Sequence, residues 1–243
     1  MENTMVERGE LLYQGKAKSL YKTADPDVLL VEFRDDTTAF DGAKKEALAL
    51  KGQVNNAISH FIMEHLQKNG VPTAVVKQLS ATECLVKRLE MMPVECVIRN
   101  IAAGSLCRRL GTAQGMMFKP ALFELFYKND ELHDPLINAN HAVTFGWATR
   151  EQLVEMERLT HLINDVLSSL FRQADLILVD AKFEFGIVNG EVVLGDEISP
   201  DSCRIWDAQT NEPLDKDRFR HDMGNVIGSY QEIARRLGIS LAE

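Results

Sequence analysis

The stretch LILVDAKFEFG, residues 176–186, carries the clearest structural signal in the chain. Successive side chains of a β-strand point to opposite faces. A strand here places Asp180, Lys182 and Glu184 on one face, and an alanine and two phenylalanines on the other. Three ionisable groups beside a buried apolar run are costly to desolvate unless they serve one another or a ligand. The pattern therefore indicates either a ligand site or a solvated face with cross-strand ion pairs.

The next segment, IVNGEVVL at residues 187–194, predicts a β-hairpin, because Asn-Gly is a strong signal for a two-residue turn. The returning strand would bring Asp196 back toward Glu184, where the two carboxylates could converge on a hard cation such as Mg²⁺. A regular two-residue turn, however, puts Asp196 on the opposite face of the sheet. We therefore expect a one-residue bulge at Gly186 or Gly195.

The rest of the chain shows a strand-rich beginning and a mixed remainder. Residues 11–33 have the pattern of short strands, apolar residues recur at helical spacing over 51–68, and residues 83–99 are expected to be extended. A capping box at residues 149–152 opens the longest expected helix, of about six turns. A last helix is expected over residues 217–237.

This order of elements lacks strict β-α-β alternation, which favours an α+β fold over a doubly wound one. An extended, proline-containing segment at residues 89–93 marks the expected subdomain boundary. The sequence thus predicts a β-rich N-terminal lobe over residues 1–90 and a mixed region of helices and strands over residues 91–243.

The segment Tyr13-Gln-Gly-Lys-Ala-Lys18 joins two expected strands. Its glycine allows the backbone to approach phosphate oxygens, and its two lysines could neutralise them. The segment lacks the Walker A spacing GxxxxGK[ST], so a plain hairpin with exposed lysines is the simpler interpretation of these residues alone.

A third segment has Arg99 at the end of an extended apolar run, followed by the small residues 102–105. A guanidinium group, a hydroxyl group and accessible backbone amides suit a phosphate or a carboxylate. The alternative is a strand end with a solvated arginine and a tight turn.

Composition excludes several classes of protein. The formal net charge of −9 opposes non-specific nucleic-acid binding, because phosphate contacts need a basic surface. No stretch approaches the ~18 uninterrupted apolar residues of a membrane span, and the first residues lack a signal-peptide core, so we expect a cytoplasmic protein without membrane partners. The cysteines show no CxxC spacing and the histidines no HExxH spacing, so neither set predicts a metal site.

Two long segments, PVECVIRNIAAGS at 93–105 and LVDAKFEFG at 178–186, resemble the signature segments of the SAICAR synthetase family. The resemblance covers nearly the whole chain and includes YQGKAKSLY at 13–21, DDTTAFDG at 35–42, FYKNDELHDP at 126–135, GDEISPDSCRIWD at 195–207 and DKDRFR at 215–220. It implies an α+β fold of two lobes with ATP in the cleft between them, as in kinases and ATP-grasp enzymes.

The resemblance also implies a nucleotide and metal site. The loop over the ATP phosphates would consist of Gly15, Lys16, Ala17 and Lys18. The adenine pocket would include Lys87, and Lys128 would approach the nucleotide. The Mg²⁺ ion would be held by Glu184 and Asp196.

By the same resemblance, the nucleotide substrate CAIR would lie on the charged strand face. Its anionic groups would be bound by Arg99, Ser105 and Arg204. The catalytic residues beside it would be Asp180 and Lys182. The edge of the site would include Asp41 and Asp134.

The reaction implied is the ATP-dependent joining of the carboxylate of CAIR, a 5-aminoimidazole ribonucleotide, to the amino group of L-aspartate in purine biosynthesis. The enzyme is expected to be a homo-oligomer, with a dimer favoured. An ionised carboxylate is a poor electrophile, so ATP must convert it to an acyl phosphate or drive a concerted equivalent. The amine must be neutral when it attacks, and Asp180 is a candidate to accept its proton.

Two rival classes fit the charged residues. A small-molecule kinase would use the same lysine loop and acidic metal ligands. A nucleotide-binding regulatory module would use them without catalysis. The products formed from ATP, with and without L-aspartate, discriminate these classes from the ligase.

Overall fold

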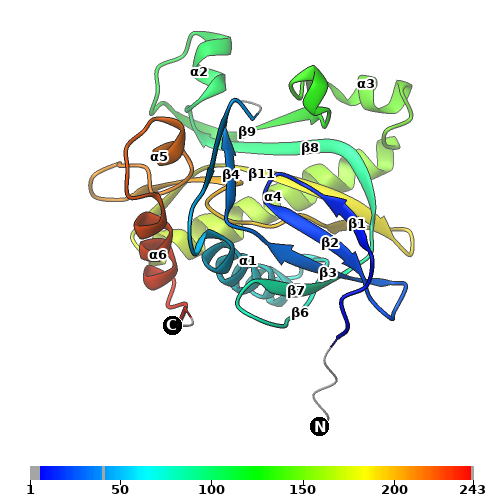
Figure 1. The fold of residues 1–243 in the computed structure, drawn as a ribbon. Helices are drawn as coiled ribbons and strands as arrows, with labels where there is room; N and C mark the ends of the chain where they lie inside the picture. Colours follow the sequence, from blue (N-terminus) through cyan, green and yellow to red (C-terminus); the bar gives the residue numbers. More distant parts are fainter. Residues whose placement is uncertain (1–5, 40–41, 242–243) are drawn as a thin grey trace.

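The structure of the chain, a computed structural model, describes residues 6–39 and 42–241. Within these residues the strands form a five-stranded sheet, a six-stranded sheet and a separate two-stranded hairpin. Figure 1 shows the smaller sheet below the long strands of the larger one, with the longest helix behind them. Antiparallel sheets combined with helices confirm the predicted α+β fold. None of the helices in the described part of the chain has the length and apolarity needed to cross a membrane.

The smaller sheet has the strand order β1-β2-β3-β7-β6, so β7 returns to pair with β3 after the chain has passed through a helix. Its strands are β1 (Leu11–Gln14), β2 (Lys18–Lys22), β3 (Val28–Phe33), β6 (Val75–Gln78) and β7 (Glu83–Lys87). The separate hairpin consists of β4 (Asp36–Ala39) and β5 (Lys44–Ala47).

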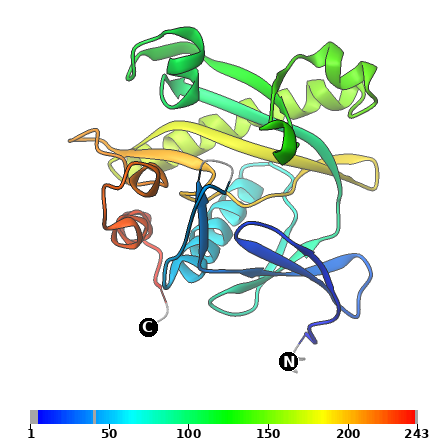
Figure 2. The ribbon, with the colours of Figure 1, turned by 45° about the horizontal axis from the view of Figure 1, so that its top comes forward.

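The larger sheet has the order β10-β9-β8-β11-β12, and β13 also pairs with β11. Its strands are β8 (Glu90–Ile101), β9 (Met117–Tyr127), β10 (Leu136–Ile137), β11 (Leu176–Val188), β12 (Glu191–Leu194) and β13 (Cys203–Asp207). On one edge of β11, its first half pairs with β13 and its last residues pair with β12. The loop over residues 195–202 therefore leaves the sheet beside the middle of β11, and Figure 2 shows β8, β9 and β11 crossing the molecule.

The helices are α1 (Lys51–Lys68), α2 (Ser105–Leu110), α3 (Ala139–Thr144), α4 (Arg150–Gln173), α5 (Asp217–Arg220) and α6 (Val226–Arg236), with a 3₁₀ turn, η1 (Asp130–Leu132). Thr149 and Gln152 form the predicted capping box at the start of α4. One face of α4 is apolar and packs against the large sheet, with Met156, Ile163 and Leu167 fully buried. The core of the molecule lies between this face and β8 and β11.

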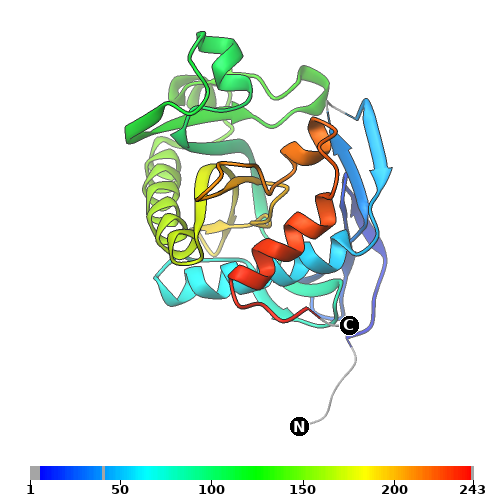
Figure 3. The same ribbon diagram turned by 90° about the vertical axis from the view of Figure 1, so that its left-hand side faces the viewer.

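Helix α1 joins the small sheet to the same core. A Cβ atom on Gly52 would lie 2.4 Å from the carbonyl oxygen of Phe33, so only glycine allows the helix to approach β3 this closely. The apolar face of α1, including Ile58 and Ile62, is buried in the core that α4 also lines. Figure 3 shows α1 and α6 side by side.

The chain passes from the small sheet to the large one between β7 and β8, at residues 88–89. The predicted division into domains at residue 90 stays a prediction, because α1 belongs to the first part of the chain and buries its apolar face with the second.

The last helix differs from the prediction. Two helices, α5 and α6, replace the single helix expected over residues 217–237. Between them Asp222, Gly224 and Asn225 adopt positive φ angles, which a right-handed helix does not allow. The helical spacing of the apolar residues was correct for α6, but it did not reveal this break.

The bulge expected in the hairpin after β11 is also wrong. The pairing of β11 with β12 is uninterrupted from Phe185–Leu194 to the turn. The register shifts instead between β11 and β8, opposite Gly186, where a Cβ atom would lie 2.9 Å from the carbonyl oxygen of Glu90. Asp196 lies beyond the end of β12, so the alternation of the sheet does not determine where its side chain points.

We predict that Ile163→Ala lowers the free energy of unfolding by about 2–5 kcal/mol, because it removes a fully buried side chain and leaves a cavity against the sheet. Val154→Ala, on the exposed side of the same helix, is the matched control and should change it by less than about 0.5 kcal/mol. Denaturant unfolding followed by circular dichroism measures both. Equal effects would contradict the assignment of the core to this face of α4.

Candidate active site

The charged face predicted for β11 is present. Asp180 and Glu184 are buried on the side of the large sheet away from α4, with Lys182 between them. The alternate residues, Phe183 and Phe185, are fully buried in the core. The neighbouring strand β8 has the same alternation, so charged residues from both strands share one face.

Asp180 holds two arginines from the strands on either side of it. Its Oδ2 atom accepts hydrogen bonds from Nη1 of Arg99 and from Nη1 of Arg204, each at 2.8 Å. Both arginines lie directly opposite Asp180 in the strand register. Arg99 also donates from Nε to Glu124 of β9 at 2.7 Å. The sheet thus fixes two guanidinium groups through one carboxylate.

Arg204 also lies against the start of α2. Gly104 has a φ of 60°, and a Cβ atom there would lie 2.3 Å from Nη2 of Arg204. The glycine is therefore required for the guanidinium group to reach the backbone beside Ser105. The structure brings Arg204, Ser105 and Arg99, three residues that the resemblance assigns to one ligand, to one end of the charged face.

Lys182 lies among carboxylates. Its Nζ atom is 2.6 Å from Oε1 of Glu95 and 3.0 Å from Oε1 of Glu184. Burial opposes the charge on Lys182, but Glu184 and Glu95 outweigh this effect and raise its pKa. The side chain therefore stays an ammonium group and acts as a source of positive charge, not as a base. Burial also raises the pKa of Glu95.

Two further lysines reach the acidic residues from other elements. Lys128, after β9, forms an ion pair with Glu184. Lys18, on β2 of the small sheet, contacts both Asp196 and Glu197. Burial tends to raise the pKa of Asp196, but Lys18, Lys182 and Lys128 together lower it. Asp196 therefore lies near the charged face although it is outside the strand ladder.

The hairpin turn from Gly15 to Lys18 is held by Arg34, a residue that the sequence analysis did not identify. Nη2 of Arg34 donates to the carbonyl oxygen of Gly15 at 2.7 Å, and its backbone N–H donates to Ala17 at 2.8 Å. Lys16 points to solvent and pairs with Asp130 at 2.7 Å, whereas the Lys18 side chain is only 19% exposed. The interpretation as a plain hairpin with exposed lysines thus describes Lys16 but not Lys18.

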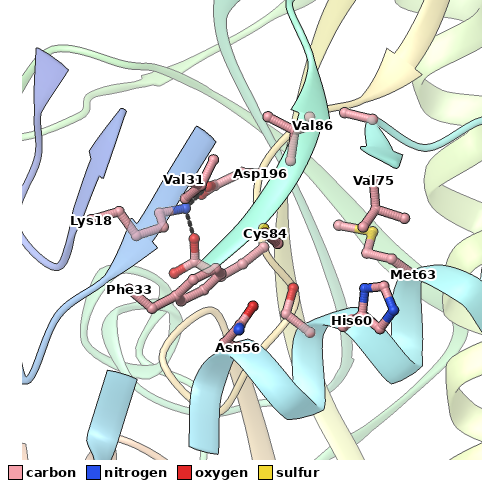
Figure 4. Close-up of a pocket in the computed structure, with 14 residues that line it drawn as sticks. Lys18, Val31, Phe33, Asn56, His60, Met63, Val75, Cys84, Val86 and Asp196 are labelled. Carbon is pink, nitrogen blue, oxygen red and sulfur yellow. Dashed lines mark hydrogen bonds and ion pairs between the residues drawn. The ribbon is translucent and has the colours of Figure 1, made fainter. Parts of the chain in front are cut away.

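An apolar pocket adjoins these charges, between the small sheet and α1. Its lining residues include Val31 of β3, Val86 of β7 and Met63 of α1. Figure 4 shows Lys18 and Asp196 at one side of the pocket. Asn56 Oδ1 and His60 Nδ1 are buried at its α1 side and make no hydrogen bond within the described residues. An apolar pocket beside a cluster of charges suits a ligand with a flat base and an anionic tail.

Three predicted site residues lie away from this arrangement or outside the description. Lys87 follows a pocket residue on β7, but its side chain is exposed and does not line the pocket, so its adenine contact stays a prediction. Asp134 accepts a hydrogen bond from the backbone N–H of Asn129 at 2.8 Å and lies near Glu95. Asp41 lies outside the described residues.

Two further residues of the site, Glu95 and Glu124, were not predicted from the sequence. Both lie on the charged face and hold Lys182 and Arg99 respectively. For Glu95 a signal was present, since it alternates with Arg99 along the segment that was read as extended. No comparable pattern marks Glu124.

The described residues contain no group of three or more histidines, cysteines or acidic residues that could hold a metal by themselves. Glu184 and Asp196 offer two carboxylates, and lysine ammonium groups neutralise both of them. Mg²⁺ is usually bound through one or two carboxylates together with substrate phosphates and water. The donor set therefore fits a magnesium ion that arrives with a nucleotide.

A sheet face that pairs buried carboxylates with lysines and arginines, next to an apolar pocket, defines an enzyme that acts on anionic substrates. A sequence model of the SAICAR synthetase family matches residues 11–237. The chain belongs to this family and is a ligase. Membership favours the ligase over the kinase and the non-catalytic module.

Two relatives match almost the whole length of the chain. Phosphoribosylaminoimidazole-succinocarboxamide synthase of Coxiella burnetii is 61% identical over 233 residues, which are 96% of this chain and 97% of that protein. The enzyme of the same name from Hahella chejuensis is 60% identical over 230 residues, 95% of this chain and 98% of its own.

Solved structures show the same fold. The synthase of Ehrlichia chaffeensis superimposes with a TM-score of 0.94 at 42% identity, covering 96% of this chain and all of that one. A SAICAR synthetase in complex with ADP gives a TM-score of 0.92, also at 42% identity and with the same coverage.

We predict that Asp180→Asn lowers the free energy of unfolding by about 3–5 kcal/mol, because two guanidinium groups would lose the carboxylate that they share in a buried position. Asp165→Asn, on the exposed face of α4, is the control and should cost less than about 0.5 kcal/mol. Chemical denaturation at constant pH measures both variants. An unchanged stability of Asp180→Asn would show that the arginines do not depend on this carboxylate.

Proposed function

We propose that this enzyme forms SAICAR by joining the carboxylate of CAIR to the amino group of L-aspartate, with an acyl phosphate as the intermediate. ATP-dependent formation of SAICAR in purine biosynthesis is the activity of the family to which the chain belongs. The observation that carries the proposal is the charged face of β11, where Lys182 lies between the arginine end and the acidic end.

The nucleotide would bind between the small sheet and the large one. The loop from Gly15 to Lys18, held by Arg34, would cover the phosphates, with Lys16 and Lys18 as their counter-charges. Lys128 supports this placement, because its ammonium group already lies beside Glu184. The adenine would lie near β7, and Lys87 at the end of this strand is the residue expected to contact it. In this placement residues 1–90 act as a lobe that covers the nucleotide.

Glu184 and Asp196 would hold Mg²⁺ at the phosphates. When bound, the ion would neutralise charge on the phosphoryl group during transfer. The lysines that contact these carboxylates hold them in place, and the lysines around Asp196 lower its pKa.

CAIR would lie along the arginine end of the face. Its phosphate would be bound by Arg204 and Arg99 together with Ser105, which lies at the start of α2. The carboxylate of Asp180 orients both guanidinium groups. Arg99 is almost fully buried, so it acts mainly through its position in this network. Asp134 would lie at the edge of the site.

The chemical step then follows from the charges. The carboxylate of CAIR would lie near Lys182, whose ammonium group offsets the negative charge of the reacting carboxylate and phosphoryl oxygens. Both arginine contacts of Asp180 use Oδ2, and within the described residues Oδ1 accepts no hydrogen bond. This oxygen is the candidate to accept the proton of the attacking amine.

The enzyme would work in the cytoplasm as a homo-oligomer, with a dimer favoured. Exposed apolar side chains support a subunit contact, since Leu136 of β10 and Phe145 after α3 are both exposed. Burying such side chains against a second copy would remove apolar surface from water.

We predict that Glu184→Gln lowers turnover by at least about a hundredfold and raises the Mg²⁺ concentration needed for half-maximal rate, because an amide is a poorer ligand for Mg²⁺ than a carboxylate. Glu191→Gln, an exposed residue at the start of β12, is the control and should behave like the wild type. Steady-state kinetics over a magnesium series measures both. Wild-type turnover and magnesium dependence in Glu184→Gln would remove this residue from the metal site.

The acyl phosphate predicts the fate of one oxygen atom. If the carboxylate of CAIR is phosphorylated before or while aspartate attacks, the phosphate leaves with a carboxylate oxygen, because amide formation expels it. CAIR labelled with ¹⁸O in the carboxylate should therefore give labelled inorganic phosphate, and only when L-aspartate is present. Mass analysis of phosphate and of SAICAR measures this. Unlabelled phosphate released together with SAICAR would exclude the mechanism but not the overall reaction.

A further inference from the structure

The segment that contains α5 lies beside the charged face and has no role in the mechanism above. Asp217 links this segment to β13, because its carboxylate accepts hydrogen bonds from Nε of Arg204 at 2.7 Å and from Nη1 of Arg220 at 2.6 Å. The backbone N–H of Lys216 donates to the carbonyl oxygen of Pro200 at 3.0 Å, in the loop that also carries Asp196. The segment is thus fixed to β13 on one side and to this loop on the other.

Lys216 is a partly buried cation in this segment. Its ammonium group interacts with Asp201, Arg220, Lys51 and Lys182, and makes no hydrogen bond or ion pair with any residue in the described ranges. Burial lowers the pKa of Lys216, and the three other cations lower it further against the opposing effect of Asp201. The single carboxylate near Lys216 therefore does not balance the positive charge of Lys216 and its three cationic neighbours.

Asp201, the one carboxylate beside Lys216 among these groups, is already in use. It accepts hydrogen bonds from Lys51 Nζ at 2.8 Å, from Asn55 Nδ2 at 3.0 Å and from Tyr230 Oη at 2.7 Å. These partners are buried and hold the carboxylate in place. The remaining positive charge belongs to Lys216 and to the part of Arg220 that Asp217 does not bind.

Other cations on the charged face differ in this respect. Lys18, Lys128 and Lys182 contact acidic side chains, and so do Arg99 and Arg204. An incompletely neutralised cation away from bulk water is costly unless an anion binds it. An anionic ligand would supply the negative charge that this site lacks.

We propose that Lys216 and Arg220 bind a carboxylate group of the amino-acid substrate, L-aspartate, and hold its amine toward Lys182 and the activated carboxyl group. The inference rests on the proposed function, which requires a dicarboxylate substrate beside the charged face. The network leaves for this substrate the ammonium group of Lys216, which is within electrostatic range of Lys182, and the part of the Arg220 guanidinium group that Asp217 does not bind. The same cations disfavour a protonated amine nearby, which promotes the neutral form that attacks.

The test is steady-state kinetics of Lys216→Met with each substrate varied in turn. The KM for L-aspartate should rise by at least about tenfold, because a charge-assisted hydrogen bond is lost, while the KM values for CAIR and ATP stay within about twofold of the wild type. Lys216→Arg keeps the cation and should restore most of the affinity for L-aspartate. Lys77→Met, an exposed lysine on β6, is the control for loss of a charge.

Other results would overturn the inference. An unchanged KM for L-aspartate would do so, and a selective rise in the KM for CAIR would assign the two cations to the phosphate of that substrate. If Lys216→Met does not fold, as judged by circular dichroism and ADP binding, Arg220→Gln takes its place with the same expected results. Wild-type protein that forms no SAICAR would refute the proposed function itself, whereas active wild type with unaffected variants refutes only the inference.

Discussion

The structure depends on one constraint, the two-residue alternation of β11 inside a sheet that is buried on one face. The strand is 13 residues long and pairs with β8 along one edge and with both β12 and β13 along the other. Its apolar side chains are required by the core under α4, so the residues between them have to face the opposite side. The packing of the apolar residues against α4 therefore also brings the ionic residues together on the other face of β11.

Placing charges on a sheet face away from water requires that they be neutralised, and the surrounding elements do this in pairs. Asp180 is shared by two arginines from neighbouring strands, and Glu184 lies between two lysines. The lysines and arginines come from both sheets and from the loops between them. Electrostatics therefore connects the small sheet to the large one at the site, in addition to the apolar contacts of α1.

The sequence was informative where a period or a local signal determines structure. The alternation in β11, the capping box of α4 and the Asn-Gly turn could each be read from a few adjacent residues. Features set by contacts between distant segments could not. Three features depend on which segments meet in space: the close approach of Gly186 to Glu90, the hydrogen bond from Arg34 to the Gly15 turn, and the position of Asp196 beyond the end of β12. The break between α5 and α6 falls at Asp222, Gly224 and Asn225, residue types that tolerate positive φ angles, and it was missed because only the apolar spacing was followed there.

Helix α1 has a consequence for the order in which the chain can fold. It is made early, within the first 68 residues, but its buried face packs against α6, which ends at Arg236. During synthesis from the N-terminus, the strands of the small sheet can pair long before that surface is covered. The part of the α1 surface that α6 covers stays open to solvent until α6 has left the ribosome. During this interval the nascent chain exposes apolar surface, and exposed apolar surface promotes aggregation.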